Sequence, residues 1–146
     1  YAGVAALASP ALGGAFEFGQ VFRRDRLAVW SFELQAGAQV MDDYMWSDED
    51  GDWAQLRGGF KASLSPCGTC HWTGRLGMAW IRSTVETDFL STPGDYYGGS
   101  VGLGYEVDLT PHLTTGPELT LLLMSEEKEF DVEVVPQLQW HFIVKL

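Results

Sequence analysis

The sequence predicts an all-β chain whose strands close into an antiparallel, eight-stranded transmembrane β-barrel with a polar, packed interior. Three observations lead to this prediction. Apolar and polar side chains alternate along most of the chain, the charged side chains of the alternating segments share one face, and short connections alternate with long acidic ones. Alternation with a period of two is the signature of a strand with unlike faces. A length of 146 residues suits one domain, spanning 1–146.

Alternation in the first half of the chain predicts four strands. The segment 2–8 is rich in alanine and is expected to be a strand mainly because membrane barrels of this kind have an even number of strands. Three stronger segments follow at 14–22, 27–40 and 53–64. In the last of these, Leu56 and Phe60 alternate with Arg57 and Lys61.

The second half predicts four more strands, at 71–83, 97–109, 113–124 and 135–146. The third of these is blurred by Leu122, which interrupts the alternation. The last is the clearest and has two series, with Leu138, Trp140, Phe142, Val144 and Leu146 on one face and Gln137, Gln139, His141 and Lys145 on the other. Such a strand suits lipid on one side and a polar interior on the other.

Charges within the strands fall on the face opposite the apolar series. On a lipid-facing side each charge would cost about 2 to 4 kcal/mol near the midplane, so we expect these charges to point inward. A buried ion-pair network that fills and fixes the barrel is predicted, and a narrow proton or ion path is the alternative. A wide pore is not expected for eight strands. The predicted network consists of Arg57, Lys61, Arg75, Glu106 and Glu118.

Connection lengths give the chain an orientation. Short links are expected at 23–26, 65–70 and 110–112, and long acidic ones at 41–52, 84–96 and 125–131. Short periplasmic turns and long external loops are typical of barrels in the outer membrane of Gram-negative bacteria. We therefore expect this location, with a signal peptide already removed.

These patterns together resemble the small OmpA/OmpX-type outer-membrane β-barrels over essentially the whole chain. The chain departs from them by ending on Leu146, where the family usually ends on an aromatic residue. The resemblance implies an architecture only, because members of this class anchor, adhere or occasionally act on lipid.

The sequence Cys67-Gly68-Thr69-Cys70-His71 has the form of the attachment motif for c-type haem. Two thiols would bond the haem and His71 would ligate iron, with His112 in the next periplasmic turn as the second axial ligand. The favoured interpretation is instead a disulfide between Cys67 and Cys70 that pins the turn, with no cofactor bound, and a zinc or redox role for Cys67, Cys70, His71 and His112 is a third alternative. The sequence leaves these alternatives open.

The remaining features concern the two ends of the barrel. The loop at 42–52 is dense in carboxylates, and Asp48, Asp50 and Asp52 are candidate calcium ligands, although the loop lacks EF-hand spacing. The external rim is expected to be acidic and to meet lipopolysaccharide through divalent cations, or to meet a basic partner. Interfacial aromatic girdles are predicted from Trp30, Trp53, Trp72, Trp80, Tyr96, Tyr97, Tyr105 and Trp140.

The net charge of −11 argues against nucleic acid as a partner. The expected partners are the lipid bilayer, lipopolysaccharide and other outer-membrane or periplasmic proteins. The expected role is structural or interactive, as an anchor or accessory subunit that presents acidic loops. A redox barrel with one haem and a lipid-modifying enzyme are the alternatives. No Ser, His and Asp arrangement in the sequence matches a nucleophile motif, so no catalytic residue is predicted.

Overall fold

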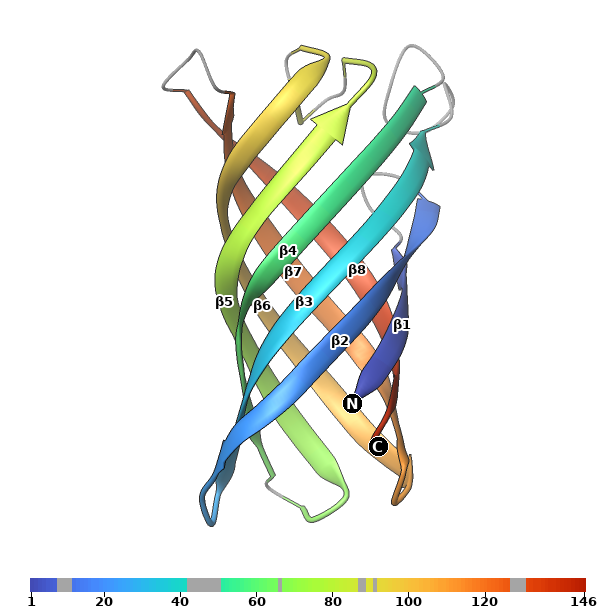
Figure 1. Ribbon diagram of the computed structural model, residues 1–146, viewed down its shortest axis with the longest axis vertical. Coiled ribbons are helices and arrows are strands. Elements are labelled where there is room, and N and C mark those ends of the chain that lie inside the picture. The colour runs from blue at the N-terminus through green and yellow to red at the C-terminus, as the bar shows by residue number, and fades with distance from the viewer. Residues whose placement is uncertain (8–11, 42–50, 66, 87–88, 91, 127–130) are drawn as a thin grey trace.

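A closed ring of eight antiparallel strands forms the whole described structure (Figure 1). The computed structural model describes residues 1–7, 12–41, 51–65, 67–86, 89–90, 92–126 and 131–146. The strands are β1 (Ala2–Leu7), β2 (Leu12–Arg24), β3 (Ala28–Met41), β4 (Gly51–Leu64), β5 (Cys70–Ser83), β6 (Gly94–Thr110), β7 (Leu113–Glu126) and β8 (Val132–Val144). Among these residues, no helix is long and apolar enough to cross a membrane.

Each strand pairs with the next, and β1 closes the ring against β8. The closing register runs from Ala2 opposite Val144 to Leu7 opposite Gln139. Closure gives every described strand a partner on both sides, which is what a strand structure in lipid requires. The predicted strand count and the weak first strand are therefore confirmed. Both termini and the short turns lie at one end of the barrel (Figure 1), which we call the periplasmic end.

The outward face of the barrel is apolar and rich in aromatic rings. Phe60 packs edge-to-face between Phe22 and Phe32, with ring centroids 6.1 and 5.9 Å away, and Trp72 packs against Tyr105 at 5.0 Å. Phe32 and Phe60, and Trp72 and Tyr105, are directly opposite each other on neighbouring strands, where cross-strand pairs stabilise the sheet. The exposed apolar side chains are those expected to meet acyl chains.

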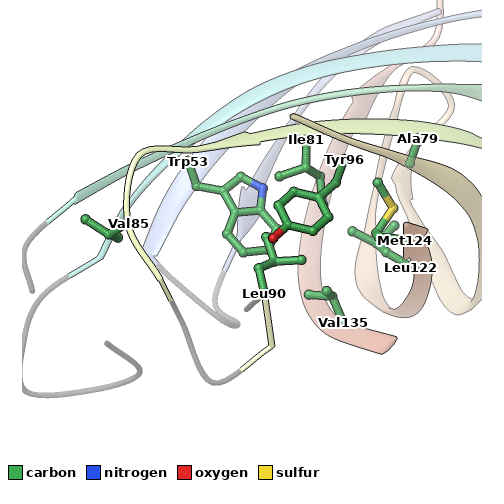
Figure 2. Packing of buried hydrophobic residues seen from close by; sticks show 9 residues of the cluster. All are labelled: Trp53, Ala79, Ile81, Val85, Leu90, Tyr96, Leu122, Met124 and Val135. Carbon is green, nitrogen blue, oxygen red and sulfur yellow. The ribbon is translucent and has the colours of Figure 1, made fainter. Parts of the chain in front are cut away.

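Two aromatic residues predicted for the interfacial girdles lie inside the barrel instead. Trp53 and Tyr96 are fully buried in an apolar cluster towards the external end (Figure 2). Leu122 belongs to the same cluster, which explains why it interrupts the alternation of β7. The girdle prediction was wrong for these two rings because alternation places both on the inward face of their strands. The other members are Ala79, Ile81, Val85, Leu90, Met124 and Val135.

The barrel interior changes in character along its axis. A layer of buried glutamines follows the apolar cluster, with Gln137 at its centre: its amide nitrogen donates to Gln55 at 2.8 Å and to Gln39 at 3.0 Å. Gln139 donates to Gln137 at 2.7 Å and is itself bonded to Gln35, so the layer continues inward. Beyond the glutamines lie the charged side chains described below. The predicted polar interior thus occupies the middle of the barrel, and its external end is apolar.

Candidate functional site

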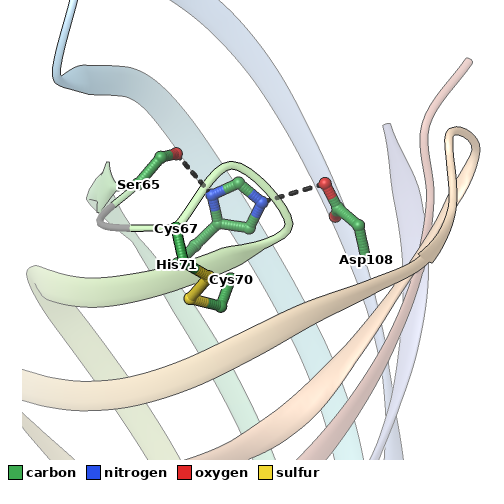
Figure 3. The surroundings of a disulfide bond; sticks show 5 residues. All are labelled: Ser65, Cys67, Cys70, His71 and Asp108. Carbon is green, nitrogen blue, oxygen red and sulfur yellow. Dashed lines mark hydrogen bonds and ion pairs between the residues drawn. A yellow bond between two sulfur atoms is a disulfide. The ribbon is translucent and has the colours of Figure 1, made fainter.

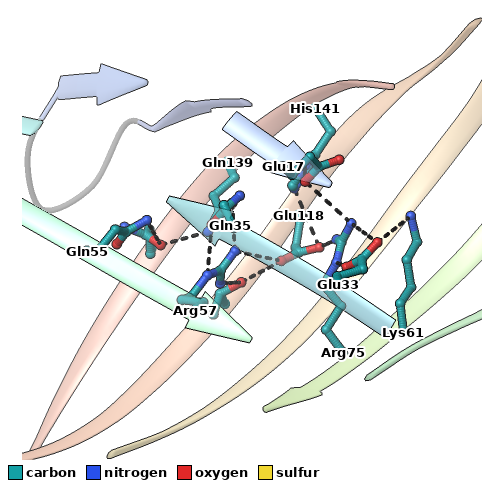
Figure 4. A network of polar contacts seen from close by, with 12 residues as sticks. Glu17, Glu33, Gln35, Gln55, Arg57, Lys61, Arg75, Glu118, Gln139 and His141 are labelled. Carbon is teal, nitrogen blue, oxygen red and sulfur yellow. Dashed lines mark hydrogen bonds and ion pairs between the residues drawn. The ribbon is translucent and has the colours of Figure 1, made fainter. Parts of the chain in front are cut away.

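Arg75 on β5 is the centre of the buried charge cluster (Figure 4). Its Nε lies 2.5 Å from Oε2 of Glu33 on β3, and its guanidinium also forms an ion pair with Glu118 on β7. Longer approaches join it to Glu106 at 3.6 Å and to Glu17 at 3.9 Å. One arginine therefore links strands across the lumen, which its planar array of five N–H donors makes possible.

Arg57 and Lys61 on β4 complete the cationic part of the cluster. Arg57 donates to Gln35 at 2.8 Å and to Gln139 at 3.0 Å, which ties the charges to the glutamine layer. Lys61 Nζ lies 2.6 Å from Oε1 of Glu106. All five residues expected in an inner ion-pair network line the lumen and take part in ion pairs.

Three further residues belong to the cluster and were not predicted as members. Glu17 and Glu33 supply two more buried carboxylates, and His141 Nδ1 lies 2.8 Å from Oε2 of Glu17. Their inward position follows from strand alternation alone. Their pairing depends on which strands face each other across the closed barrel, which alternation does not specify.

The charge cluster leaves little free space in the middle of the lumen. The cavity beside Arg75 and Arg57 has a volume of about 30 Å³. Such a space holds about one or two water molecules. Together, the apolar cluster and the charge cluster fill the external end and the middle of the described interior with side chains, as eight-stranded barrels typically do.

A larger cavity of about 260 Å³ lies at the periplasmic end of the barrel. Its wall is mixed, with hydroxyl, charged and apolar side chains from β2 to β8. Lys61 and Glu106 form its inner side and connect it to the charge cluster. The other lining residues used below are Arg24, Val29, Ser63, His71, Ile143 and Lys145.

The turn between β4 and β5 carries the Cys-x-x-Cys-His sequence. Cys67 and Cys70 form a disulfide, with their Cα atoms 5.4 Å apart, a normal separation for such a bond. Gly68 between them has φ of 77°, a left-handed conformation that glycine adopts without steric cost. Cys67 is exposed, whereas Cys70 is buried at the start of β5. The disulfide thus closes a tight turn at the periplasmic end.

Both ring nitrogens of His71 are engaged (Figure 3). Nδ1 lies 2.6 Å from Oγ of Ser65, and Nε2 lies 3.0 Å from Oδ2 of Asp108 on the neighbouring strand. Sequence reasoning did not bring these three residues together. The signal is the strand register: the amide of Asp108 bonds the carbonyl of Thr69 at 2.8 Å, which places Asp108 beside the turn.

This arrangement does not suit a c-type haem. Covalent attachment uses both thiols, which here bond each other, and iron ligation needs a ring nitrogen that His71 has already committed. His112, the expected second axial ligand, contacts the carbonyl of Lys145 at 3.4 Å. Haem attachment therefore stays a prediction, and the geometry favours the disulfide.

Of the three predicted calcium ligands, the structure describes only Asp52, at the start of β4. Asp48 and Asp50 fall outside the described residues. Asp52 is exposed, and its backbone amide and carbonyl pair with Thr84. Within the described ranges, no group of three or more His, Cys, Asp or Glu side chains is placed to hold a metal ion. Calcium binding stays a prediction.

Comparison with known proteins identifies the fold but shows no family. No protein-family model matches the chain, and no curated protein matches it. Among solved structures, the outer membrane enzyme PagL has a TM-score of 0.64 at 9% identity, covering 99% of this chain and 97% of that chain. Ail, the attachment invasion locus protein of Yersinia pestis, scores 0.60 at 12% identity, covering 97% and 93%. Neisserial surface protein A scores 0.57 at 12% identity, covering 99% and 93%.

The chain therefore has the fold of the small eight-stranded outer-membrane β-barrels. This result confirms the predicted architecture and the resemblance to OmpA/OmpX-type barrels, and it agrees with the predicted outer-membrane location. At 9 to 12% identity the likeness concerns the fold. The similar structures include both an enzyme and surface proteins, so the fold does not choose an activity.

Proposed function

We propose that this protein is a non-conducting anchor in the outer membrane that presents a strongly acidic external rim to a cationic partner. The observation that carries the proposal is the pairing of a filled lumen with a one-sided charge distribution. A filled lumen argues against transport through the barrel. The concentration of acidic residues in the external connections indicates that a partner would bind there.

The filled lumen rests on two consecutive layers. Trp53, Tyr96, Leu122 and Met124 are each fully buried at the external end. The Arg75 cluster follows, with only about 30 Å³ of free space beside it. Opening a path would require breaking several buried ion pairs, and losing a single one costs about 3 to 5 kcal/mol.

The external rim consists of the connections 41–52, 84–96 and 125–131, which contain 13 acidic residues and one basic residue, Lys128. Among the described rim residues, Asp52 and Asp131 are exposed, and Asp95 pairs with Arg82 at 2.7 Å. A field of one sign attracts partners of the opposite sign and repels those of the same sign.

One of the similar structures has been solved with an anionic ligand. Ail has been solved in complex with the heparin analogue sucrose octasulfate, a polyanion. An acidic rim disfavours such a ligand unless divalent cations bridge the two. A basic protein, or phosphates of lipopolysaccharide bridged by divalent cations, is the chemistry that the rim favours.

The test measures binding of a basic probe, polylysine, to the barrel reconstituted in liposomes of neutral lipid. The rim variant replaces the acidic residues of the three connections by Asn and Gln. The matched control neutralises Arg23 and Arg24 at the end of β2 and Arg26 in the turn that follows. We expect binding that weakens with salt and falls at least tenfold in the rim variant only. Equal binding by the rim variant, or binding of heparin in the absence of divalent cations, would contradict the proposal.

A further inference from the structure

Ser65, His71 and Asp108 form a continuous hydrogen-bonded chain at the periplasmic end (Figure 3). An ionised carboxylate only accepts hydrogen bonds, so Nε2 of His71 is the donor to Asp108. In the neutral ring, the other nitrogen, Nδ1, carries no proton and accepts the hydroxyl hydrogen of Ser65 at 2.6 Å. A hydroxyl, an imidazole and a carboxylate in this order are the parts of an activated serine nucleophile.

Asp108 is fixed in the orientation that this chain requires. Its Oδ1 accepts from Lys145 Nζ at 2.6 Å and from Thr114 Oγ1 at 2.5 Å, which leaves Oδ2 for His71. Lys145 also keeps a positive charge beside the carboxylate, which favours its ionised form. Asp108 therefore fixes the orientation of the His71 ring, and its negative charge stabilises the positive charge that the ring acquires on protonation.

The disulfide holds the other two members together. Ser65 precedes the loop closed by Cys67 and Cys70, and His71 follows it directly. A covalent closure of this short loop limits the positions that the hydroxyl and the ring can take relative to each other. The disulfide thus helps to keep Ser65 and His71 within hydrogen-bonding distance.

The three hydrogen-bonded side chains lie beside a cavity that a small molecule can occupy. His71 lines the 260 Å³ cavity, and its side chain is 16% exposed. Lys61 pairs with Glu106 and Lys145 pairs with Asp108, whereas Arg24 on the same wall forms no ion pair with any residue that the structure describes. Val29 and Ile143 add apolar wall. This lining suits a short acyl compound that also carries an anionic group.

We propose that Ser65 and His71 are the catalytic residues of an esterase site that acts on short, anionic carboxylic esters reaching the barrel from the periplasm. Asp108 is a positioning residue of this site. The site lies at the periplasmic end, where His71 lines the cavity, so it is separate from the external rim, and its activity does not depend on the proposed binding function.

The reaction proceeds in two balanced halves. Oγ of Ser65 attacks the ester carbonyl carbon while its proton passes to Nδ1 of His71; the bond to the alcohol oxygen then breaks, and Nδ1 returns the proton to that oxygen. Water next attacks the acyl carbon on Ser65 and gives a proton to Nδ1. The bond to Oγ breaks, Ser65 regains the proton, and the carboxylic acid leaves. Arg24 is the group available to attract the anionic end of the substrate.

The first test uses a fluorophosphonate probe, which reacts with activated serines, on the full chain folded in detergent micelles. We expect covalent labelling of wild type at Ser65 and none of Ser65→Ala. Ser63→Ala is the matched control, because Ser63 lines the cavity beside His71 and is not the hydrogen-bond partner of His71. Folding of each variant is verified by circular dichroism and by a shift in electrophoretic mobility on heating. Folded wild type without label, or labelled Ser65→Ala, would overturn the proposal.

The second test measures hydrolysis of the 4-nitrophenyl monoester of succinic acid. Removal of a general base typically costs a hundredfold or more, so His71→Gln should reduce kcat at least a hundredfold. Asp108→Asn should lower kcat while leaving KM within about twofold of wild type, which a general loss of structure would not do. Arg24→Gln should raise KM for this ester and leave the neutral 4-nitrophenyl acetate unaffected. Equal rates for wild type and Ser65→Ala would refute the assignment.

Discussion

Lys61 Nζ lies 2.6 Å from Oε1 of Glu106 inside the barrel, and both side chains are almost completely buried. The pair joins β4 to β6 across the lumen, since the two strands are separated in the sheet by β5. Both side chains border the periplasmic cavity but are only 5 to 6% exposed, so each charge is stabilised mainly by its neighbours. The stability of the barrel should therefore depend strongly on this pair.

Loss of one member of this pair should be costly. We expect Lys61→Met or Glu106→Gln to lower the free energy of unfolding by about 3 to 5 kcal/mol, because each leaves a buried charge without its main partner. The double variant should cost less than the sum of the two. Urea unfolding in lipid vesicles measures all three.

The matched control for this prediction is the exposed pair of Arg23 and Asp25. Its atoms lie 3.0 Å apart, but the side chains are 66% and 44% exposed. Exposed pairs contribute about 0 to 1 kcal/mol, so Arg23→Ala should have little effect. A Lys61→Met barrel as stable as the Arg23→Ala barrel would contradict the buried role of Lys61.

Two neighbouring leucines of β7 test the apolar cluster. Leu122 is fully buried in the cluster, and Leu121 is 38% exposed on the outward face. Leu122→Ala should lower the free energy of unfolding by about 2 to 5 kcal/mol, because it opens a cavity among fixed neighbours. Leu121→Ala should cost clearly less, since lipid chains can fill the space. A larger loss of unfolding free energy for Leu121→Ala than for Leu122→Ala would contradict the inward position of the cluster.

Two neighbouring glycines of β6 test how closely the strands approach. A methyl group on Gly98 would collide with the backbone carbonyl of Leu123, whereas one on Gly99 would meet only Gly77 O at 3.8 Å. We expect Gly98→Ala to destabilise the barrel by about 1 to 3 kcal/mol. Gly99→Ala should be nearly neutral. The melting temperatures of the two variants decide this, and the prediction is contradicted if they agree.

The fold was predictable from the sequence because lipid imposes a simple rule on each strand. Glu106 and Leu103 differ in face by strand position alone, so alternation places both correctly. Trp53 and Tyr96 were misplaced because they were assigned to the membrane interface by residue type, although their positions in the alternation point inward. Residue preference is a weaker guide than strand position in a closed barrel.

The candidate site was less predictable because it depends on contacts between strands. The Cys-x-x-Cys-His sequence indicated that the turn before β5 is special, but not why. Asp108 lies 37 residues from His71. Only the register of β5 and β6 brings its carboxylate to the ring, and alternation does not set that register.

The cysteine pair can be examined by intact mass. We expect the non-reduced chain to be lighter than the reduced chain by two hydrogen atoms, as one disulfide requires. A covalently attached haem would instead add the mass of one haem and give an absorbance band near the Soret position. Detection of that added mass would replace the disulfide account of Cys67 and Cys70.

The central claim is that apolar side chains face lipid while the charged and glutamine layers are sealed within the barrel. The most direct measurement is fluorescence quenching by brominated acyl chains in single-tryptophan variants, with the other tryptophans replaced by Phe. Trp140 on the outward face of β8, 46% exposed, should be strongly quenched, and buried Trp53 should be nearly unaffected. Equal quenching of the two, or stronger quenching of Trp53, would contradict the account.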